Sequence, residues 1–170
     1  MDWQMLTLVG EDQPGIVAQV TEALFNGGCT LGETSMIRLG GNFTIMLMVS
    51  DGDQSLLKLI EPVAEKLQLQ FHLDPIRGAL HQHRAPNFQV RVVGADRAGI
   101  VARVTGALAA EGFNILELES DVVGSSEQPV YIMTIQGYAE ATLESLEAVL
   151  ENAEDADIEV NISPIETLIG

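Results

Sequence analysis

The hydrophobic residues of this chain follow the same succession of spacings twice. In the first half, the apolar run from Gln4 to Val9 and the alternation from Phe43 to Val49 predict β-strands, because successive side chains of a strand point to opposite faces. Apolar residues three and four apart between and after these runs predict helices. The expected order is strand, helix, strand, strand, helix, strand. The same order recurs from Phe88 to Ile162.

Local signals predict where the two helices of the first half begin and end. Asp12 is expected to cap the first helix, and Pro14 to lie in its first turn. Gly27 and Gly28 are expected to end it. Pro62 is expected to kink or interrupt the second helix. The buried stripes are predicted to consist of Ile16, Val17, Val20, Ala23 and Leu24 in the first helix, and of Leu56, Leu57, Ile60, Val63, Ala64 and Leu67 in the second.

A repeated segment opens each series of elements. Residues Val9 to Leu24 and Val93 to Leu108 align without a gap at an offset of 84, and eleven of their sixteen positions are identical. Such a repeat indicates a duplicated structural unit. The stretch RGALHQHRAP, residues 77–86, interrupts the periodicity. We therefore expect two domains, residues 1–77 and 87–170, joined by a linker at residues 78–86.

The order of elements in each domain predicts an α+β fold. It is the order of an antiparallel four-stranded sheet with two helices on one face. Some strands carry apolar residues toward both faces, as where Met46 and Met48 alternate with Ile45 and Leu47. A second apolar face needs a cover. We therefore expect the chain to form a homodimer.

The charge of the chain limits the classes of molecule that it is expected to bind. With 25 acidic and 8 basic residues, the net charge is −17. A strongly negative surface repels phosphate backbones and anionic lipid surfaces, so direct nucleic-acid or membrane binding is not expected. An acidic surface is compatible with simple solvation or with a basic protein partner.

Cysteine usage and hydropathy favour a cytoplasmic, soluble protein. Cys29 is the one cysteine of the sequence, so no internal disulfide is possible, and a reducing compartment is the simplest interpretation. No signal peptide or membrane-spanning run is apparent. His81 and His83 have no cluster of cysteine or carboxylate residues beside them, so we predict no metal site and no cofactor.

The repeated segment resembles the signature of the ACT domain. Asp12-Gln13-Pro14-Gly15-Ile16-Val17 and Asp96-Arg97-Ala98-Gly99-Ile100-Val101 each follow a predicted strand and open a helix, and Gly112-Phe113-Asn114-Ile115 resembles the Gly-x-Asn-Ile of the second strand. Two such domains in a chain of this length resemble the glycine cleavage system transcriptional repressor family. The resemblance implies ferredoxin-like βαββαβ units that bind small effectors, usually amino acids. It also implies action through a protein partner, a transcriptional activator.

The candidate effector-binding residues lie at the two turns and at the strands that follow the first helices. A helix N-terminus can hold a carboxylate, and a glycine lets a ligand approach the backbone closely. An aspartate can accept from an ammonium group, and an asparagine can both donate and accept. The candidates are Asp12, Pro14, Gly15, Ile16 and Thr30 in the first domain, and Asp96, Ala98, Gly99, Ile100 and Asn114 in the second.

Each of these residues also has a structural interpretation. Asp12 and Asp96 would serve as helix caps, the two glycines would permit close packing, and Asn114 would be a turn residue. The two copies also differ, because Thr30 stands where the second copy has Asn114, and Ala98 stands where the first has Pro14. Asn114 slightly favours the second domain as the binding site, or a composite site shared by both.

The leading hypothesis is a non-enzymatic regulator of amino-acid metabolism. It would bind an amino acid such as glycine and act on a protein partner, for which the effector must favour one of two states. The alternative is a regulatory subunit that acts in trans on a metabolic enzyme. An RNA-binding module is disfavoured, because such a module needs exposed strand aromatics and a basic surface, whereas aromatic residues make up 5% of this acidic chain.

Overall fold

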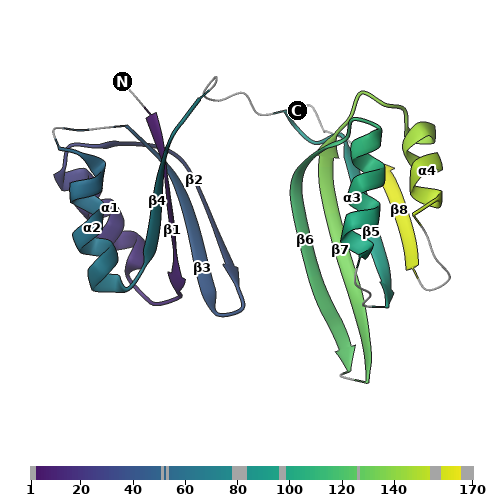
Figure 1. Ribbon diagram of the computed structural model, residues 1–170, viewed down its shortest axis with the longest axis horizontal. Helices are drawn as coiled ribbons and strands as arrows, with labels where there is room; N and C mark the ends of the chain where they lie inside the picture. The colour runs from purple at the N-terminus through teal and green to yellow at the C-terminus, as the bar shows by residue number, and fades with distance from the viewer. Residues whose placement is uncertain are drawn as a thin grey trace. The chain divides into compact units, whose positions relative to one another are not determined.

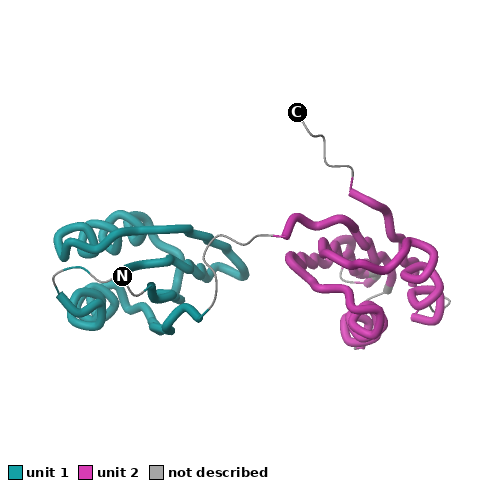
Figure 2. Tube along the Cα trace, turned by 90° about the horizontal axis from the view of Figure 1, so that it is seen from above, with its two compact units in different colours: residues 1–80 teal, residues 81–170 magenta. Residues whose placement is uncertain are grey.

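The structure is a computed structural model that describes residues 3–50, 52, 54–77, 84–95, 99–125, 127–153 and 158–165. The chain divides into two compact units, residues 1–80 and 81–170 (Figure 2). The boundary between the units falls inside the predicted linker, residues 78–86. Most of that linker, with His81 and His83, lies outside the described residues.

Each unit has the element order that the hydrophobic pattern predicts. Unit 1 consists of β1 (Trp3–Glu11), α1 (Ile16–Asn26), β2 (Thr30–Leu39), β3 (Asn42–Ser50), α2 (Leu56–Leu67) and β4 (Gln70–Pro75). Unit 2 consists of β5 (Phe88–Ala95), α3 (Ile100–Ala110), β6 (Asn114–Ser125), β7 (Gln128–Tyr138), α4 (Leu143–Glu151) and β8 (Ile158–Pro164).

The strands of each unit form an antiparallel sheet with the same topology. The order across the sheet is β2-β3-β1-β4 in unit 1 and β6-β7-β5-β8 in unit 2. Figure 1 shows that the helices of each unit lie along one face of its own sheet. The predicted α+β class and the ferredoxin-like βαββαβ unit are confirmed, because the first and third strands of each unit are neighbours at the centre and the fourth is at an edge.

A separate hydrophobic core forms between the sheet and the helices of each unit. One strand face supplies Leu6 and Leu8 in β1, and the equivalent residues Val90 and Val92 in β5 are equally buried. Every fourth residue of the first helix meets this face. The helix residues so buried are Ile16, Val20 and Leu24 in α1, and Ile100, Val104 and Leu108 in α3.

The predicted helix stripes were too wide, and of the two effects predicted for Pro62, a kink or an interruption of α2, the interruption is wrong. Val17 is 42% exposed and Leu57 is 50% exposed, because each is one position past a buried residue and therefore turns about 100° away from the sheet. Helix α2 runs from Leu56 to Leu67 without interruption although Pro62 lies inside it. Ile60 and Ala64, which are buried on either side of the proline, hold both halves against the sheet.

At the ends of β2, α1 and α2 the chain reverses at glycine, with one exception. The hairpin between β2 and β3 turns at Gly40 and Gly41, whose φ angles of 58° and 79° match a two-residue turn with positive φ at both positions. Helix α1 ends at Asn26, and two residues later Gly28 has φ 75°, where the amides of Gly28 and Cys29 donate to the carbonyls of Phe25 and Leu24.

The exception is the end of α2. There Gln68 adopts a left-handed conformation, with φ 55°, that glycine usually supplies. The amides of Gln68 and Leu69 donate to the carbonyls of Glu65 and Ala64, the pattern seen at the end of α1. Gln68 therefore carries backbone strain that its neighbours do not.

The sheet faces that the helices leave uncovered differ between the units. In unit 1, this open face carries exposed apolar side chains, among them Met46 and Ile37. In unit 2, the open face is polar around Arg91, which pairs across strands with Thr134 on one side and Asn161 on the other, and apolar where exposed Val123 pairs with Val130. The expectation of apolar residues on both sheet faces therefore applies to both units.

None of the helices in the described ranges is both long and apolar enough to cross a membrane.

The strain at Gln68 gives a first prediction. Gln68→Gly removes a left-handed conformation that costs a non-glycine residue about 1–2 kcal/mol, partly offset by the greater freedom of glycine in the unfolded chain. We expect the free energy of unfolding, measured by urea denaturation, to rise by about 0.5–1 kcal/mol. The control Glu65→Gly, inside the same helix, should lower it by about 1 kcal/mol. A loss of stability in Gln68→Gly would contradict the prediction.

Candidate effector site

The turn between β1 and α1 is built around a left-handed glycine. Helix α1 begins at Ile16, and its N-cap is Gly15, with φ 88° and ψ 2°. The predicted cap at Asp12 is wrong: no side chain caps this helix, and Pro14 lies before it and not in its first turn. The left-handed conformation requires glycine for backbone reasons, since a Cβ at Gly15 would meet only the Gln19 side chain, at 3.7 Å.

Asp12 instead joins this turn to the β2–β3 hairpin. Its carboxylate Oδ2 lies 2.6 Å from Nε of Arg38, and its amide donates to the carbonyl of Gly41 at 3.1 Å. The Arg38 side chain is 66% exposed and that of Asp12 31% exposed, so solvent screens this ion pair, and it contributes at most about 1 kcal/mol. Its role is to position the turn, while the outer surface of the Asp12 carboxylate stays open to solvent.

A second contact joins the turn to the end of α2. The side-chain amide of Gln13 donates to the carbonyl of Leu67 at 3.1 Å. That carbonyl belongs to the last turn of α2, where carbonyls have no partner within the helix. The turn is thus held from two sides, by the hairpin through Asp12 and by α2 through Gln13.

The second copy of the turn repeats the glycine geometry. Gly99 caps α3 with φ 98° and ψ −5°, and again no side chain among the described residues caps the helix. A Cβ at Gly99 would meet nothing within 4 Å, so the space over this backbone is open. The candidates Asp96 and Ala98 lie outside the described residues, as does Arg97, the counterpart of Gln13.

Both turns therefore present an uncapped helix N-terminus to solvent. The first amides of a helix have no intrahelical partner, and in the part of the chain that the structure describes no side chain supplies one and no acidic residue occupies the first turn. Amides in this position, at the positive end of the helix dipole, favour a carboxylate or another anion. The chemistry available at Gly15 and Gly99 is therefore binding through the backbone.

The side chains of Ile16 and Ile100 do not face these turns. Ile16 is 3% exposed and Ile100 is 2% exposed, and each belongs to the core of its unit. The next two residues of each helix, Val17 and Ala18 in α1 and Val101 and Ala102 in α3, are exposed. The apolar residues beside the turns are instead Val17 and Val101, both about two-fifths exposed. The sequence shows that both repeats have valine at this position, but the helical spacing of apolar residues predicted that these valines would be buried in the core.

Thr30 and Asn114 occupy equivalent places at the starts of the edge strands β2 and β6. Both are exposed, and each is followed at once by a β-bulge, between Leu31 and Thr34 in β2 and between Ile115 and Glu117 in β6. A bulge bends its strand and changes the direction of nearby side chains, which is why bulges recur beside binding sites.

These strand starts lie at the far end of the sheet from the glycine turns. Thr30 pairs with Ser50, which also pairs with Trp3 at the beginning of β1, whereas the glycine turn follows the end of β1. In unit 2, Asn114 pairs with Tyr138 beside the beginning of β5. Strand β5 has 8 residues, so its two ends are about 23 Å apart. Within one unit, the fold therefore does not bring Gly99 and Asn114 together.

Comparison with known proteins agrees with this geometry. Residues 5–74 match one ACT-domain family model, and residues 88–151 match another, so the two ranges together cover most of the chain. The chain belongs to the ACT-domain family. It carries two such domains in tandem, one in each unit, as the repeated segment predicts.

Among curated proteins, the tandem ACT chain is similar to the glycine cleavage system transcriptional repressor of Escherichia coli (strain K12). The two are 28% identical over 120 residues, which cover 68% of this chain and 63% of the relative. The repressor of Shigella flexneri matches to the same extent. The aligned segment thus spans less than two thirds of these relatives.

Two solved structures resemble the whole chain. A protein of unknown function from Galdieria sulphuraria superposes with a TM-score of 0.77 at 22% identity, covering 97% of this chain and 99% of its own. A candidate glycine cleavage system transcriptional repressor superposes with a TM-score of 0.71 at 20% identity, covering 98% of both chains. At these identities, the two likenesses establish the fold.

The described residues contain no group of three or more histidine, cysteine or acidic side chains placed to hold a metal ion.

The left-handed glycines give a second prediction. Gly99→Ala has open space for its methyl group, so only the backbone conformation opposes it, and we expect a loss of about 1–2 kcal/mol in the free energy of unfolding. Gly106→Ala is the matched control, because Gly106 lies inside α3 with open space around it and no positive φ. It should add up to about 1 kcal/mol. Equal effects in urea denaturation would show that Gly99 is not strained in solution.

Proposed function

We propose that this protein is a non-enzymatic regulator that binds an amino acid at its glycine turns and passes the signal to a protein partner. The observation that carries the proposal is the pair of uncapped helix N-termini behind left-handed glycines. An amino-acid carboxylate fits this geometry, because the free amides supply donors and the absent Cβ leaves the backbone accessible. Glycine, the smallest amino acid, makes the least demand on the surrounding side chains.

The remaining groups of a ligand require a second set of residues. In unit 1, the carboxylate of Asp12, which lies beside the turn, is a candidate partner for a ligand ammonium. Thr30 and Asn114 offer hydroxyl and amide groups, but they lie at the opposite ends of their own sheets. The glycine turn and the strand start of one domain therefore do not contribute to a single site within that domain. Regulation requires that the ligand at either place binds two states of the protein with different affinity.

The proposed partner is a transcriptional regulator, and the proposed location is the cytoplasm. Support comes from the similarity to proteins described as glycine cleavage system transcriptional repressors. The acidic surface makes direct contact with DNA unfavourable, so a regulator of this kind would act by contacting another protein.

Ligand-dependent stability tests the effector proposal. We expect glycine or another amino acid, at about 100 times its dissociation constant, to add about 2.7 kcal/mol to the free energy of unfolding. Thermal unfolding of the full chain against a panel of amino acids measures this as a rise in Tm. Four variants then locate the site, each compared with its own ligand-free Tm. They are Gly15→Ala, Gly99→Ala, Thr30→Ala and Asn114→Ala.

The pattern of losses distinguishes the possible sites. Loss of the ligand response in Gly15→Ala or in Gly99→Ala alone would place the ligand at that glycine turn, and loss in Thr30→Ala or in Asn114→Ala alone would place it at that strand start. Gly106→Ala should respond as the original chain does. No response to any amino acid would refute the effector proposal, and turnover of an amino acid by the pure protein would refute a non-enzymatic role.

The open face of unit 1 supports a homodimer. Val9, Ile37 and Met46 project from this face and remain exposed at 39%, 64% and 42%. Covering such a patch with a second copy removes apolar surface from water at about 25 cal/mol per Å².

A charge on that face should dissociate the dimer. Met46→Glu places a carboxylate among the apolar side chains, and we expect the molecular mass from sedimentation equilibrium to shift toward the monomer. Thr134→Glu is the matched control, because Thr134 is the equivalent of Met46 in unit 2. Met46 pairs with Thr7, and Thr134 pairs with Arg91, the residue equivalent to Thr7. A monomeric original chain, or dissociation by both variants, would argue against this interface.

A further inference from the structure

Three methionines line one pocket on the open sheet face of unit 1. The pocket has a volume of about 200 Å³, and Met5 reaches it from β1 while Met46 and Met48 reach it from β3. Met5 pairs directly with Met48 across the two strands. Met46 lies two residues from Met48 and therefore points to the same face of the sheet. Half of the six methionines in the sequence thus gather at one place.

Met48 is held firmly although it lies on the open face. It is 8% exposed, and the residues on either side of it in β3 belong to the core on the opposite face. The Trp3 ring and the backbone of β2 lie close to it, because a Cβ at Gly32 would lie 3.0 Å from the ring and 3.1 Å from the Cβ of Met48. Met46 is 42% exposed. The pocket therefore combines a fixed thioether with one that solvent reaches.

The β-bulge of β2 places oxygen atoms at the rim of this pocket. Glu33 lies between the paired residues Leu31 and Thr34, where the register shifts, and it lines the pocket together with Thr34 and Ser35. Thioether groups carry no charge, so a carboxylate beside them offsets the charge of a bound cation. The surroundings of the three sulfur atoms therefore favour a cation over an anion.

All three methionines have polar counterparts in unit 2. The pairing of β5 with β7 places Gln89, Thr134 and Gln136 at the equivalent positions. Glutamine and methionine have unbranched side chains of similar length, so two of the three exchanges replace sulfur by an amide with little change of shape. The two ACT domains have therefore diverged here in chemistry more than in geometry.

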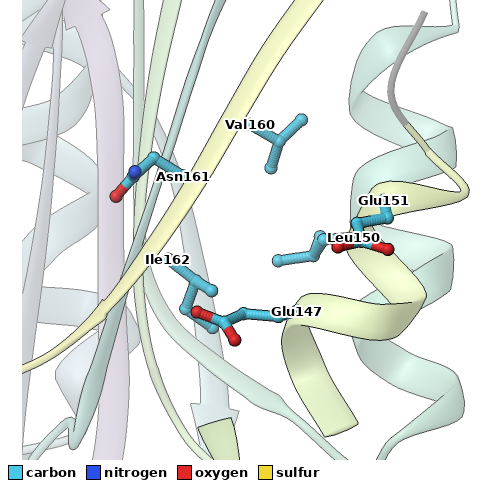
Figure 3. A pocket seen from close by; sticks show the side chains of 6 residues that line it. All are labelled: Glu147, Leu150, Glu151, Val160, Asn161 and Ile162. Atoms are coloured by element: carbon cyan, nitrogen blue, oxygen red, sulfur yellow. The ribbon is translucent and has the colours of Figure 1, made fainter. Parts of the chain in front are cut away.

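Two pockets of unit 2 likewise present oxygen and nitrogen atoms. Between α4 and β8, Figure 3 shows the carboxylates of Glu147 and Glu151 and the carboxamide of Asn161. Leu150 and Ile162 beside them belong to the core of unit 2. A second pocket, on the open face of unit 2, is lined mainly by polar residues, among them Asn161. Neither pocket offers the sulfur ligands that unit 1 does.

We propose that Met5, Met46 and Met48 bind a soft monovalent metal ion, of which Cu⁺ is the biological example. Thioether sulfur selects such ions, whereas Zn²⁺ takes imidazole, thiolate or carboxylate and Mg²⁺ takes oxygen. The residues described around the pocket include no imidazole and no thiol. The prediction of no metal site was based on histidine, cysteine and carboxylate ligands. The proposed site is also independent of effector binding at the glycine turns.

The test uses the full chain with Ag⁺, which shares the charge and the soft character of Cu⁺. Methionines labelled with ¹³C in their methyl groups give separate nuclear magnetic resonance signals, and substitutions by leucine assign them. We expect Ag⁺ to shift the signals of Met5, Met46 and Met48. The signals of Met36, a lone exposed thioether, and of the buried Met133 should not move.

Isothermal titration calorimetry measures the affinity for Ag⁺. Both measurements use the Cys29→Ser chain, because a thiol would compete for the metal. Met5→Leu and Met46→Leu should each weaken binding by at least about tenfold, because each removes one sulfur ligand. Met36→Leu is the matched control, and its affinity should stay within about twofold of the original because Met36 lies outside the pocket.

Several results would overturn the proposal. These are unmoved signals of the three methionines, an equal shift of the Met36 signal, and full affinity in Met5→Leu. An equal shift with Zn²⁺ would also count against a soft-metal site. The signal shifts are measured without altering the methionines, so they test the site even where a leucine variant misfolds.

Two further readouts separate this site from the proposed functions. Leucine keeps the open face apolar at similar volume, so the mass of the leucine variants from sedimentation equilibrium should match that of the original chain. Their rise in Tm with amino acids should also be unchanged. Loss of the amino-acid response alone would remove effector sensing, and loss of Ag⁺ binding alone would remove the metal site.

Discussion

Each unit depends on the burial of one sheet face beneath two helices. The apolar stripes of α1 and α3 reach the sheet only if each helix reverses direction directly after a strand, and a left-handed glycine makes that reversal possible. The same reversal leaves the helix N-terminus without a side-chain cap among the described residues. Folding and the proposed effector binding thus draw on one backbone geometry at Gly15 and Gly99. This explains why the segment around each glycine is the most similar part of the two repeats.

Outside that segment, the two domains have diverged on the surfaces that the core does not use. The open sheet face is apolar around Met46 in unit 1 and polar around Arg91 in unit 2. Helix α2 is balanced in charge, whereas α4 is purely acidic. Duplication of a fold supplies two stable cores, after which each exposed surface can change without endangering either core. A tandem protein can therefore give its two domains different tasks.

The sequence predicted the fold well because periodicity and glycine placement both reflect local physics. It predicted the site less completely. Asp12 has the spacing of a helix cap, but the helix begins later in the chain. Its carboxylate instead forms an ion pair with Arg38, which is distant in the sequence. Val17 was included in the predicted buried stripe because the apolar character of Ile16 and Val17 does not reveal which of the two faces the sheet. The separation of Gly99 from Asn114 follows from strand direction, which becomes apparent only when the topology is known.

The β-bulges at the starts of β2 and β6 have a consequence for solubility. Both strands lie at sheet edges, and both expose apolar residues such as Ile37 and Val122, so a flat edge here would invite other strands to add without limit. The extra residue in each bulge leaves one position without an opposite partner and increases the local twist. Uncontrolled stacking of strands into fibrils needs a regular, uninterrupted edge. The bulges thus allow an apolar edge to persist on the surface while opposing its growth into an aggregate.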